Sequence, residues 1–286
     1  MSNGGFNPAE FKNVLRQDWD RAAGGWDKWW EVIEKGSRPV SQRLLELAVI
    51  KEGDRILDVA TGIGEPAISA AKMVGPRGRV VAVDFSQGML EVARRRASQL
   101  GLGNMEFHVM DGEELKLDED GFDAVLCRWG LMFFPDPASA LTTMTGLLKK
   151  GGRLAAAVWD TPDKVPMISL PMGVVRKELK LPPPPSDKPN PFSLADKARC
   201  ERMLREAGLN VVSVEGIDVT LELPDIKTYC AYIKDVAGPV MALLKDQSEE
   251  RRTQIWKAIE GACGRFALTS GGIKMENQAI CVAGRK

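Results

Sequence analysis

The chain has 286 residues, of which 44% are hydrophobic, enough to bury a sizeable core in one large domain or one domain with an elaboration. Lysine plus arginine equals aspartate plus glutamate, at 39 each, which excludes a global field that would recruit nucleic acid or a membrane surface. No basic-then-apolar leader begins the sequence, and no apolar run approaches a membrane span. We therefore expect a cytoplasmic protein with a small-molecule partner.

Residues 8–34 carry apolar side chains mostly at helical spacing, and several of them are tryptophans. The adjacent pair Gly24 and Gly25 is expected to break this segment into two helices. Together they predict a helical segment ahead of the first strand.

Strand and helix patterns alternate from about residue 54 to residue 160. Strand patterns occupy residues 54–60, 79–84, 105–111, 122–129 and 152–159. Helix patterns occupy residues 66–74, 86–101 and 137–152, the second opened by Ser86 and the third closed by lysines and glycine. This cadence predicts an α/β fold with a doubly wound, mostly parallel sheet.

The C-terminal part has a different character. Residues 160–193 are rich in proline and methionine, which favours an ordered loop or lid, with the prolines at 182–185 as a stiff linker. A capped helix is predicted over 193–209, one strand or two short strands over 210–223, helices over 224–268 and a last strand over 277–286.

The stretch "LDVATGIGEPA", residues 57–67, places G-x-G-x-x-A between a strand and a helix. This loop binds either a dinucleotide pyrophosphate or S-adenosylmethionine. Asp58 precedes the glycines, where it would repel a pyrophosphate but suits the ammonium group of S-adenosylmethionine. Asp84 ends the next strand and would bind ribose hydroxyls of either cofactor. Asp111, at the third strand end, would accept from an adenine amino group and favours S-adenosylmethionine.

Five ordered blocks within residues 38–160 resemble a class I S-adenosylmethionine-dependent methyltransferase, most closely the ubiquinone/menaquinone-biosynthesis-like small-molecule group. They read "LDVATGIGEPA", "VVAVDFSQGMLEVARRRA", "MDGEEL", "FDAVLCRWGLMFFPDP" and "LLKKGGRLAAAVW". The resemblance implies a seven-stranded Rossmann-like methyltransferase fold with N-terminal helices and a helical C-terminal insertion. It implies a helical cap over 1–37, a cofactor-binding core over 38–160, and a lid, helical insertion and final strands over 161–286.

The resemblance also implies a cofactor site. It places the methionine moiety, the ribose and the adenine against Asp58, Ala60, Thr61, Gly62, Gly64, Asp84, Phe85, Met89, Asp111, Gly112, Glu113, Cys127 and Arg128. The segment "CRWGLMFF" departs from the quinone enzymes, so a quinone substrate is not implied. The arginines at 94–96 are interpreted as a solvated helix face.

Candidate substrate-pocket residues share aromatic or thioether side chains, which suit a flat or flexible apolar small molecule. They are Trp26, Trp30, Trp129, Met132, Phe133, Trp159, Met167 and Met172. Residues 160–193 and the segment 26–30 are expected to cover the methyl acceptor from opposite sides, which would exclude water.

No catalytic base or metal ligand is assigned. His108, the single histidine, lies inside a predicted strand, and the five cysteines are scattered without a C-x-x-C pair. The sequence therefore predicts a methyltransferase that methylates carbon, oxygen or nitrogen of a small, largely apolar molecule. A non-methylating cyclase or regulatory protein with the same cofactor fold and an NAD(P)-dependent oxidoreductase stay as alternatives. Whether the protein forms a homodimer stays open.

Overall fold

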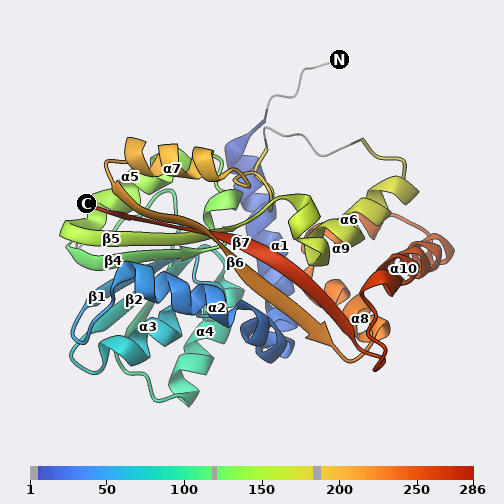
Figure 1. The fold of residues 1–286 in the computed structure, drawn as a ribbon, viewed down its shortest axis with the longest axis horizontal. Coiled ribbons are helices and arrows are strands. Elements are labelled where there is room, and N and C mark those ends of the chain that lie inside the picture. Colours follow the sequence, from blue (N-terminus) through green and yellow to red (C-terminus); the bar gives the residue numbers. More distant parts are fainter. Residues whose placement is uncertain (1–5, 118–120, 183–187) are drawn as a thin grey trace.

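A computed structural model describes residues 6–117, 121–182 and 188–286 (Figure 1). Its centre is a seven-stranded sheet in the order β3-β2-β1-β4-β5-β7-β6. The strands are β1 (Arg55–Val59), β2 (Arg79–Asp84), β3 (Met105–Val109), β4 (Phe122–Arg128), β5 (Leu148–Trp159), β6 (Asn210–Leu223) and β7 (Ile273–Arg285). The first five strands are parallel, and β7 runs antiparallel between β5 and β6. The predicted fold class is confirmed.

Helices cover both faces of this sheet, which explains why its central strands are almost wholly apolar. One face carries α2 (Trp30–Ala48), α3 (Ala67–Val74) and α4 (Gln87–Gln99), and the other carries α5 (Pro137–Leu147) and α7 (Lys197–Glu206) (Figure 1). Ser86 caps α4 as predicted, because its side chain accepts from the Met89 amide. The expected cap boundary at residue 37 falls inside α2, which packs on the sheet.

The predicted third helix is too long at its C-terminus. It ends at Leu147, and the residues predicted to close it belong to β5. The cause is tertiary, because Leu148 already pairs with Phe122 of β4. Residues 210–223 form one strand with a register shift between Val211 and Ser213.

A second hydrophobic core lies beyond the sheet. It is built by the helices predicted over 224–268, namely α8 (Ile226–Val236), α9 (Gly238–Leu244), α10 (Glu249–Cys263) and the short η3 (Gly264–Phe266), together with α6 (Pro166–Glu178) (Figure 1). A loop was expected where the short η2 (Pro162–Lys164) and α6 lie. That expectation is wrong, because burial of Leu170 and Val175 in this core stabilises a helix despite Pro171 in its interior. Of the predicted proline linker, residues 183–185 lie outside the described residues.

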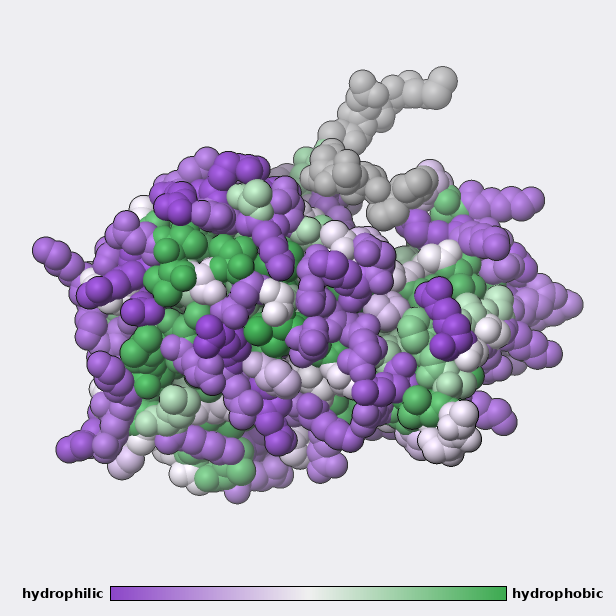
Figure 2. All heavy atoms as spheres, in the orientation of Figure 1, coloured by the Kyte–Doolittle hydropathy of each residue, from purple (hydrophilic) through white to green (hydrophobic). Residues whose placement is uncertain are grey.

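The surface over α2, β6 and β7 is mostly hydrophilic, with hydrophobic side chains in separate patches (Figure 2). All five cysteines are buried and unpaired. None of the described helices has both the length and the apolar character needed to cross a membrane.

The first helix, α1 (Pro8–Lys28), runs unbroken through the two adjacent glycines, so the predicted break there is wrong. It ends at Lys28, and Trp29 alone separates it from α2. Gly25 is present because α1 crosses α8 closely: a Cβ at this position would lie 2.0 Å from the Asp235 carbonyl oxygen. Gly24 faces open space, where an added Cβ would meet nothing within 4 Å.

This pair gives a matched test of the helix crossing. Gly25→Ala is expected to lower the free energy of unfolding by about 1–3 kcal/mol, the usual cost of overpacking. Gly24→Ala, on the exposed face, is expected to raise it by about 0.5–1 kcal/mol, because alanine favours the helix. Urea denaturation of both variants measures the two effects, and equal shifts would contradict the close crossing.

Candidate active site

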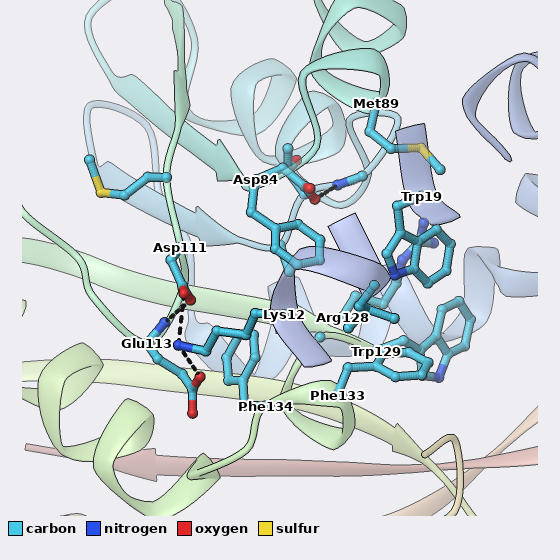
Figure 3. A pocket seen from close by; sticks show the side chains of 18 of the residues that line it. Lys12, Trp19, Asp84, Met89, Asp111, Glu113, Arg128, Trp129, Phe133 and Phe134 are labelled. Atoms are coloured by element: carbon cyan, nitrogen blue, oxygen red, sulfur yellow. Dashed lines mark hydrogen bonds and ion pairs between the residues drawn. The ribbon is translucent and has the colours of Figure 1, made fainter. Parts of the chain in front are cut away.

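A cavity that is open to solvent lies at the carboxyl ends of β1 to β4. Parallel strands bring these ends to one sheet edge, the place where ligands bind in open α/β folds. Helix α1 covers the cavity, and η1 (Leu131–Phe133) forms part of its wall (Figure 3). The lining residues are Lys12, Leu15, Trp19, Trp26, Ala60, Thr61, Gly62, Ile63, Glu65, Asp84, Phe85, Met89, Met110, Asp111, Gly112, Glu113, Arg128, Trp129, Gly130, Phe133, Phe134 and Pro135.

The glycine loop turns its backbone toward this cavity. Ala60 and Gly62 have φ of 58° and 57°, in the left-handed region, and both line the cavity. Gly64 lies beneath the loop instead. A Cβ there would meet the Ile68 side chain at 2.9 Å, and its φ of 103° also favours glycine. The structure thus brings Ala60, Thr61 and Gly62 to the cavity but gives Gly64 a packing role.

Asp58 lies below the glycine loop, fully buried and outside the cavity lining. One of its oxygens, Oδ2, accepts from the Ala67 amide at 3.2 Å, at the start of α3. Burial raises the pKa of Asp58 to about 7. The predicted role of this carboxylate, to meet a cofactor ammonium group directly or through water, stays a prediction, because Asp58 does not itself line the cavity.

The raised pKa makes stability depend on pH. Between about pH 4 and pH 7 the unfolded chain has released the Asp58 proton and the folded protein retains it. The free energy of unfolding is therefore expected to fall as pH rises through this window. In Asp58→Asn this fall should be smaller, which chemical denaturation at several pH values would measure. Identical pH profiles for both proteins would contradict the buried carboxyl group.

Asp84 connects the loop to α4 at the cavity wall. Its Oδ2 accepts from the Gly62 amide at 2.8 Å, and its Oδ1 accepts from the Ser86 amide at 2.9 Å. The side chain is only 6% exposed, and burial raises its pKa to about 6. Phe85 and Met89, predicted beside the adenine, also line the cavity.

Asp111, Gly112 and Glu113 line the end of the cavity at β3, as the sequence placed them. Lys12 of α1 reaches both acids, at 2.7 Å from Asp111 Oδ2 and 2.6 Å from Glu113 Oε2 (Figure 3). Burial lowers the pKa of Lys12, but its two carboxylate partners outweigh this and raise it. A Cβ on Gly112 would meet the Phe134 ring at 2.6 Å, so glycine lets this ring pack. Lys12 was missed because a lysine in a helical pattern carries no sequence signal.

Aromatic rings form the wall between α1 and η1. Trp19 contacts Trp26 and Phe133 edge-on, with ring centroids 5.5 and 5.8 Å apart (Figure 3). Trp129 lines the cavity and stacks on Trp159 at 4.3 Å. Of the predicted substrate residues, the structure brings Trp26, Trp129 and Phe133 to the cavity.

The other five predicted substrate residues do not line it. Trp30 is 38% exposed and covers Arg96, Met132 is buried beneath the wall, and Trp159 lies behind Trp129. Met167 and Met172 pack against hydrophobic cores. None of the described residues between 160 and 193 lines the cavity, whereas α1 does, so the expected cover of an acceptor from the other side stays a prediction.

A buried charge cluster forms the floor. The Arg128 guanidinium, which lines the cavity, donates to Glu34 at 3.1 Å, Ser37 at 3.0 Å and Ser41 at 2.8 Å, all on α2. Cys127 does not line the cavity, and burial raises its pKa to about 12. Arg96 is buried and donates to the Ile63 carbonyl, so the predicted solvated face is wrong there.

Residues 50–208, more than half of the chain, match the family model described as a methyltransferase domain. The chain is 31% identical over 147 residues to aklanonic acid methyltransferase DauC of Streptomyces sp. strain C5, covering 51% of this chain and 66% of that protein. It is 35% identical over 162 residues to the ubiquinone/menaquinone biosynthesis C-methyltransferase UbiE of Pseudomonas fluorescens, covering 53% and 63%. The chain thus spans less than two thirds of these curated relatives.

Among solved structures, phosphoethanolamine N-methyltransferase 2 of Haemonchus contortus, in complex with S-adenosyl-L-methionine, superposes with a TM-score of 0.59. The identity is 17%, and the match covers 100% of this chain and 61% of that one, so this likeness shows the fold alone. The match to the family model establishes the family, and the matched residues include β1 to β4, whose ends form the cavity. This chain belongs to the methyltransferase domain family.

Proposed function

We propose that the protein is an S-adenosylmethionine-dependent methyltransferase that acts on a small, largely apolar molecule. One observation carries the proposal. A single cavity at the carboxyl ends of β1 to β3 is lined by the acids Asp84 and Asp111 and by Gly62 of the glycine loop, whose amide donates to Asp84. An acid at the end of the second strand suits ribose hydroxyls, and an acid at the end of the third suits an adenine amino group. These donors and acceptors fit S-adenosylmethionine.

The cofactor would supply a methyl group on a sulfonium, which is already an excellent leaving group. The protein's task is therefore to align the acceptor and to exclude water. Trp19, Trp26 and Phe133 offer flat apolar surfaces for this, because α1 lays two of them over the cavity opposite η1. We infer that the acceptor is a flat molecule that binds against these rings.

Among the described residues, the acids that line the cavity are Glu65, Asp84, Asp111 and Glu113. Its lining includes no histidine, tyrosine or cysteine. Glu65 Oε2 accepts from the Ser69 amide at 3.2 Å, Asp84 accepts from two amides, and Asp111 and Glu113 share an ion pair with Lys12. The proposal therefore assigns no proton transfer to a side chain. The acceptor would be a nucleophile in its own right, such as an amine or an acidic carbon or oxygen that is ionised near neutral pH.

The proposal is tested by calorimetry with S-adenosylmethionine, S-adenosylhomocysteine and NAD, followed by transfer of a labelled methyl group to a panel of flat aromatic acceptors. We expect micromolar binding of the two S-adenosyl compounds, no binding of NAD, and transfer to at least one acceptor. Trp19→Ala should lower transfer more than cofactor affinity, because its ring contacts Phe133 rather than the acids. Binding of NAD alone would overturn the proposal, and binding without transfer to any acceptor would favour a non-methylating protein.

A further inference from the structure

Helix α1 lies across the cavity with one continuous face. Lys12, Leu15, Trp19 and Trp26 recur at helical spacing, and all four line the cavity. Figure 3 shows α1 passing between the acids of β3 and the aromatic wall. A ligand at this sheet edge would therefore be enclosed between the strand ends and α1.

Asp111 and Glu113 each have one carboxylate oxygen that accepts from a backbone amide and one that pairs with Lys12. Asp111 Oδ1 accepts from the Glu113 amide at 3.0 Å, and Glu113 Oε1 accepts from the Asp136 amide at 2.6 Å. The remaining oxygens, Asp111 Oδ2 and Glu113 Oε2, both face the Lys12 ammonium. Glu113 Oε2 is buried, whereas the Asp111 side chain is 28% exposed, so an adenine amino group could share the second lone pair of an Asp111 oxygen with Lys12.

The ion pairs lie partly out of water. The side chains of Lys12, Asp111 and Glu113 are 22%, 28% and 8% exposed. Charge-assisted hydrogen bonds are strong in such surroundings, whereas fully exposed pairs contribute little. Farther along, α1 is held by Asp20, which accepts from Ser86 Oγ and from the Gly88 amide, and by Asp27 against Arg95. Lys12 is thus the tie that joins α1 to the acids of the cavity.

We infer that Lys12 is a positioning residue of the cofactor site: it orients Asp111 and Glu113 and holds α1 across that end of the cavity. This inference rests on the proposed function, because it concerns the same cofactor. Its consequence is kinetic. Because α1 lies across the end of the cavity that holds these acids, opening of the Lys12 ion pairs would widen the way out, and we expect the pairs to slow the exchange of S-adenosylhomocysteine.

The test is stopped-flow tryptophan fluorescence of S-adenosylhomocysteine release, for which Trp19 and Trp26 are reporters in the cavity. This ligand lacks the sulfonium charge, so removal of a lysine changes little of its long-range attraction. Lys12→Met is expected to raise the dissociation rate constant about fivefold, on the scale of a partly buried ion pair. Lys12→Arg should retain a rate within about twofold of the wild type, because it keeps the charge.

Lys28→Met is the matched control. Lys28 also fastens α1, through Asp235 of α8 at 2.7 Å, but it does not line the cavity. We expect its release rate to stay within about twofold of the wild type. Added salt should accelerate release from the wild type and leave Lys12→Met unchanged, because salt screens the ion pairs.

Equal release rates in wild type and Lys12→Met would overturn the inference, and so would equal acceleration by Lys28→Met, which would indicate general loosening of α1. A salt-independent wild-type rate would also count against it. A wild-type protein that binds no S-adenosyl compound at all would instead refute the proposed function. Thermal unfolding of each variant is the control for folding: an unchanged midpoint would show that the substitution has not destabilised the protein.

Discussion

Arg128→Met is expected to lower the free energy of unfolding by about 3–5 kcal/mol, the usual cost of breaking a buried ion pair on one side. The Arg128 and Glu34 side chains are only 5% and 11% exposed, and the guanidinium also donates hydrogen bonds to the hydroxyl groups of Ser37 and Ser41. Removing it leaves Glu34 buried without its cation, and two hydroxyl groups lose a donor. Urea denaturation at neutral pH measures the loss.

The double variant Glu34→Leu with Arg128→Met separates the charge from the packing. Replacing both partners removes the uncompensated charge, so most of the lost stability should return. Arg77→Met gives the surface comparison, because Arg77 and its partner Glu52 are 76% and 60% exposed, so the variant should change stability by less than about 1 kcal/mol. If Arg128→Met alone were as stable as the wild type, this cluster would not hold α2 to β4.

Asp84→Ala is expected to weaken S-adenosylmethionine binding by about 1.5–3 kcal/mol, or roughly 10- to 150-fold. The variant loses a charged acceptor for the ribose hydroxyls. It also loses the carboxylate that accepts from the Gly62 amide, so one hydrogen bond between the glycine loop and β2 is lost. Calorimetry measures the affinity. The control is Glu106→Gln, which changes an acid of β3 that does not line the cavity and should leave the affinity unchanged.

Asp84 also predicts how affinity depends on pH. Its pKa is raised to about 6 by burial, and the ionised form is the better acceptor for hydroxyl groups. Affinity should therefore fall as pH decreases through about 6 in the wild type, whereas Asp84→Ala should be weak at every pH. A wild-type affinity that stays constant from pH 5 to pH 8 would contradict the ribose assignment.

The strands of the parallel sheet and the acids that follow them could be predicted from the sequence. Buried strands are short apolar runs, and adjacent parallel strands end at one edge, so Asp84 and Asp111 had to lie close to the glycine loop. The burial of Asp58 beneath that loop could not be predicted. A strand-end acid has the same pattern whether it points up into a cavity or down into the core.

Predictions from local residue types were wrong in two segments, where packing against a distant segment determined the secondary structure. Two adjacent glycines weaken an isolated helix, yet α1 continues through them because α8 approaches at Gly25. Prolines and methionines between 160 and 193 suggest a loop, yet α6 forms because the second core buries its apolar side. In both segments tertiary packing outweighs local propensity.

Hydrophobic period and chain order were enough to predict the sheet, the glycine loop and the acids at the strand ends. The cover of the cavity depends instead on how distant helices pack. Lys12, Trp19 and Trp26 lie far from the glycine loop in the chain and meet it only because α1 packs across α4 and α8. Such a contact is set by the shapes of three packed elements, and no single stretch of sequence encodes it.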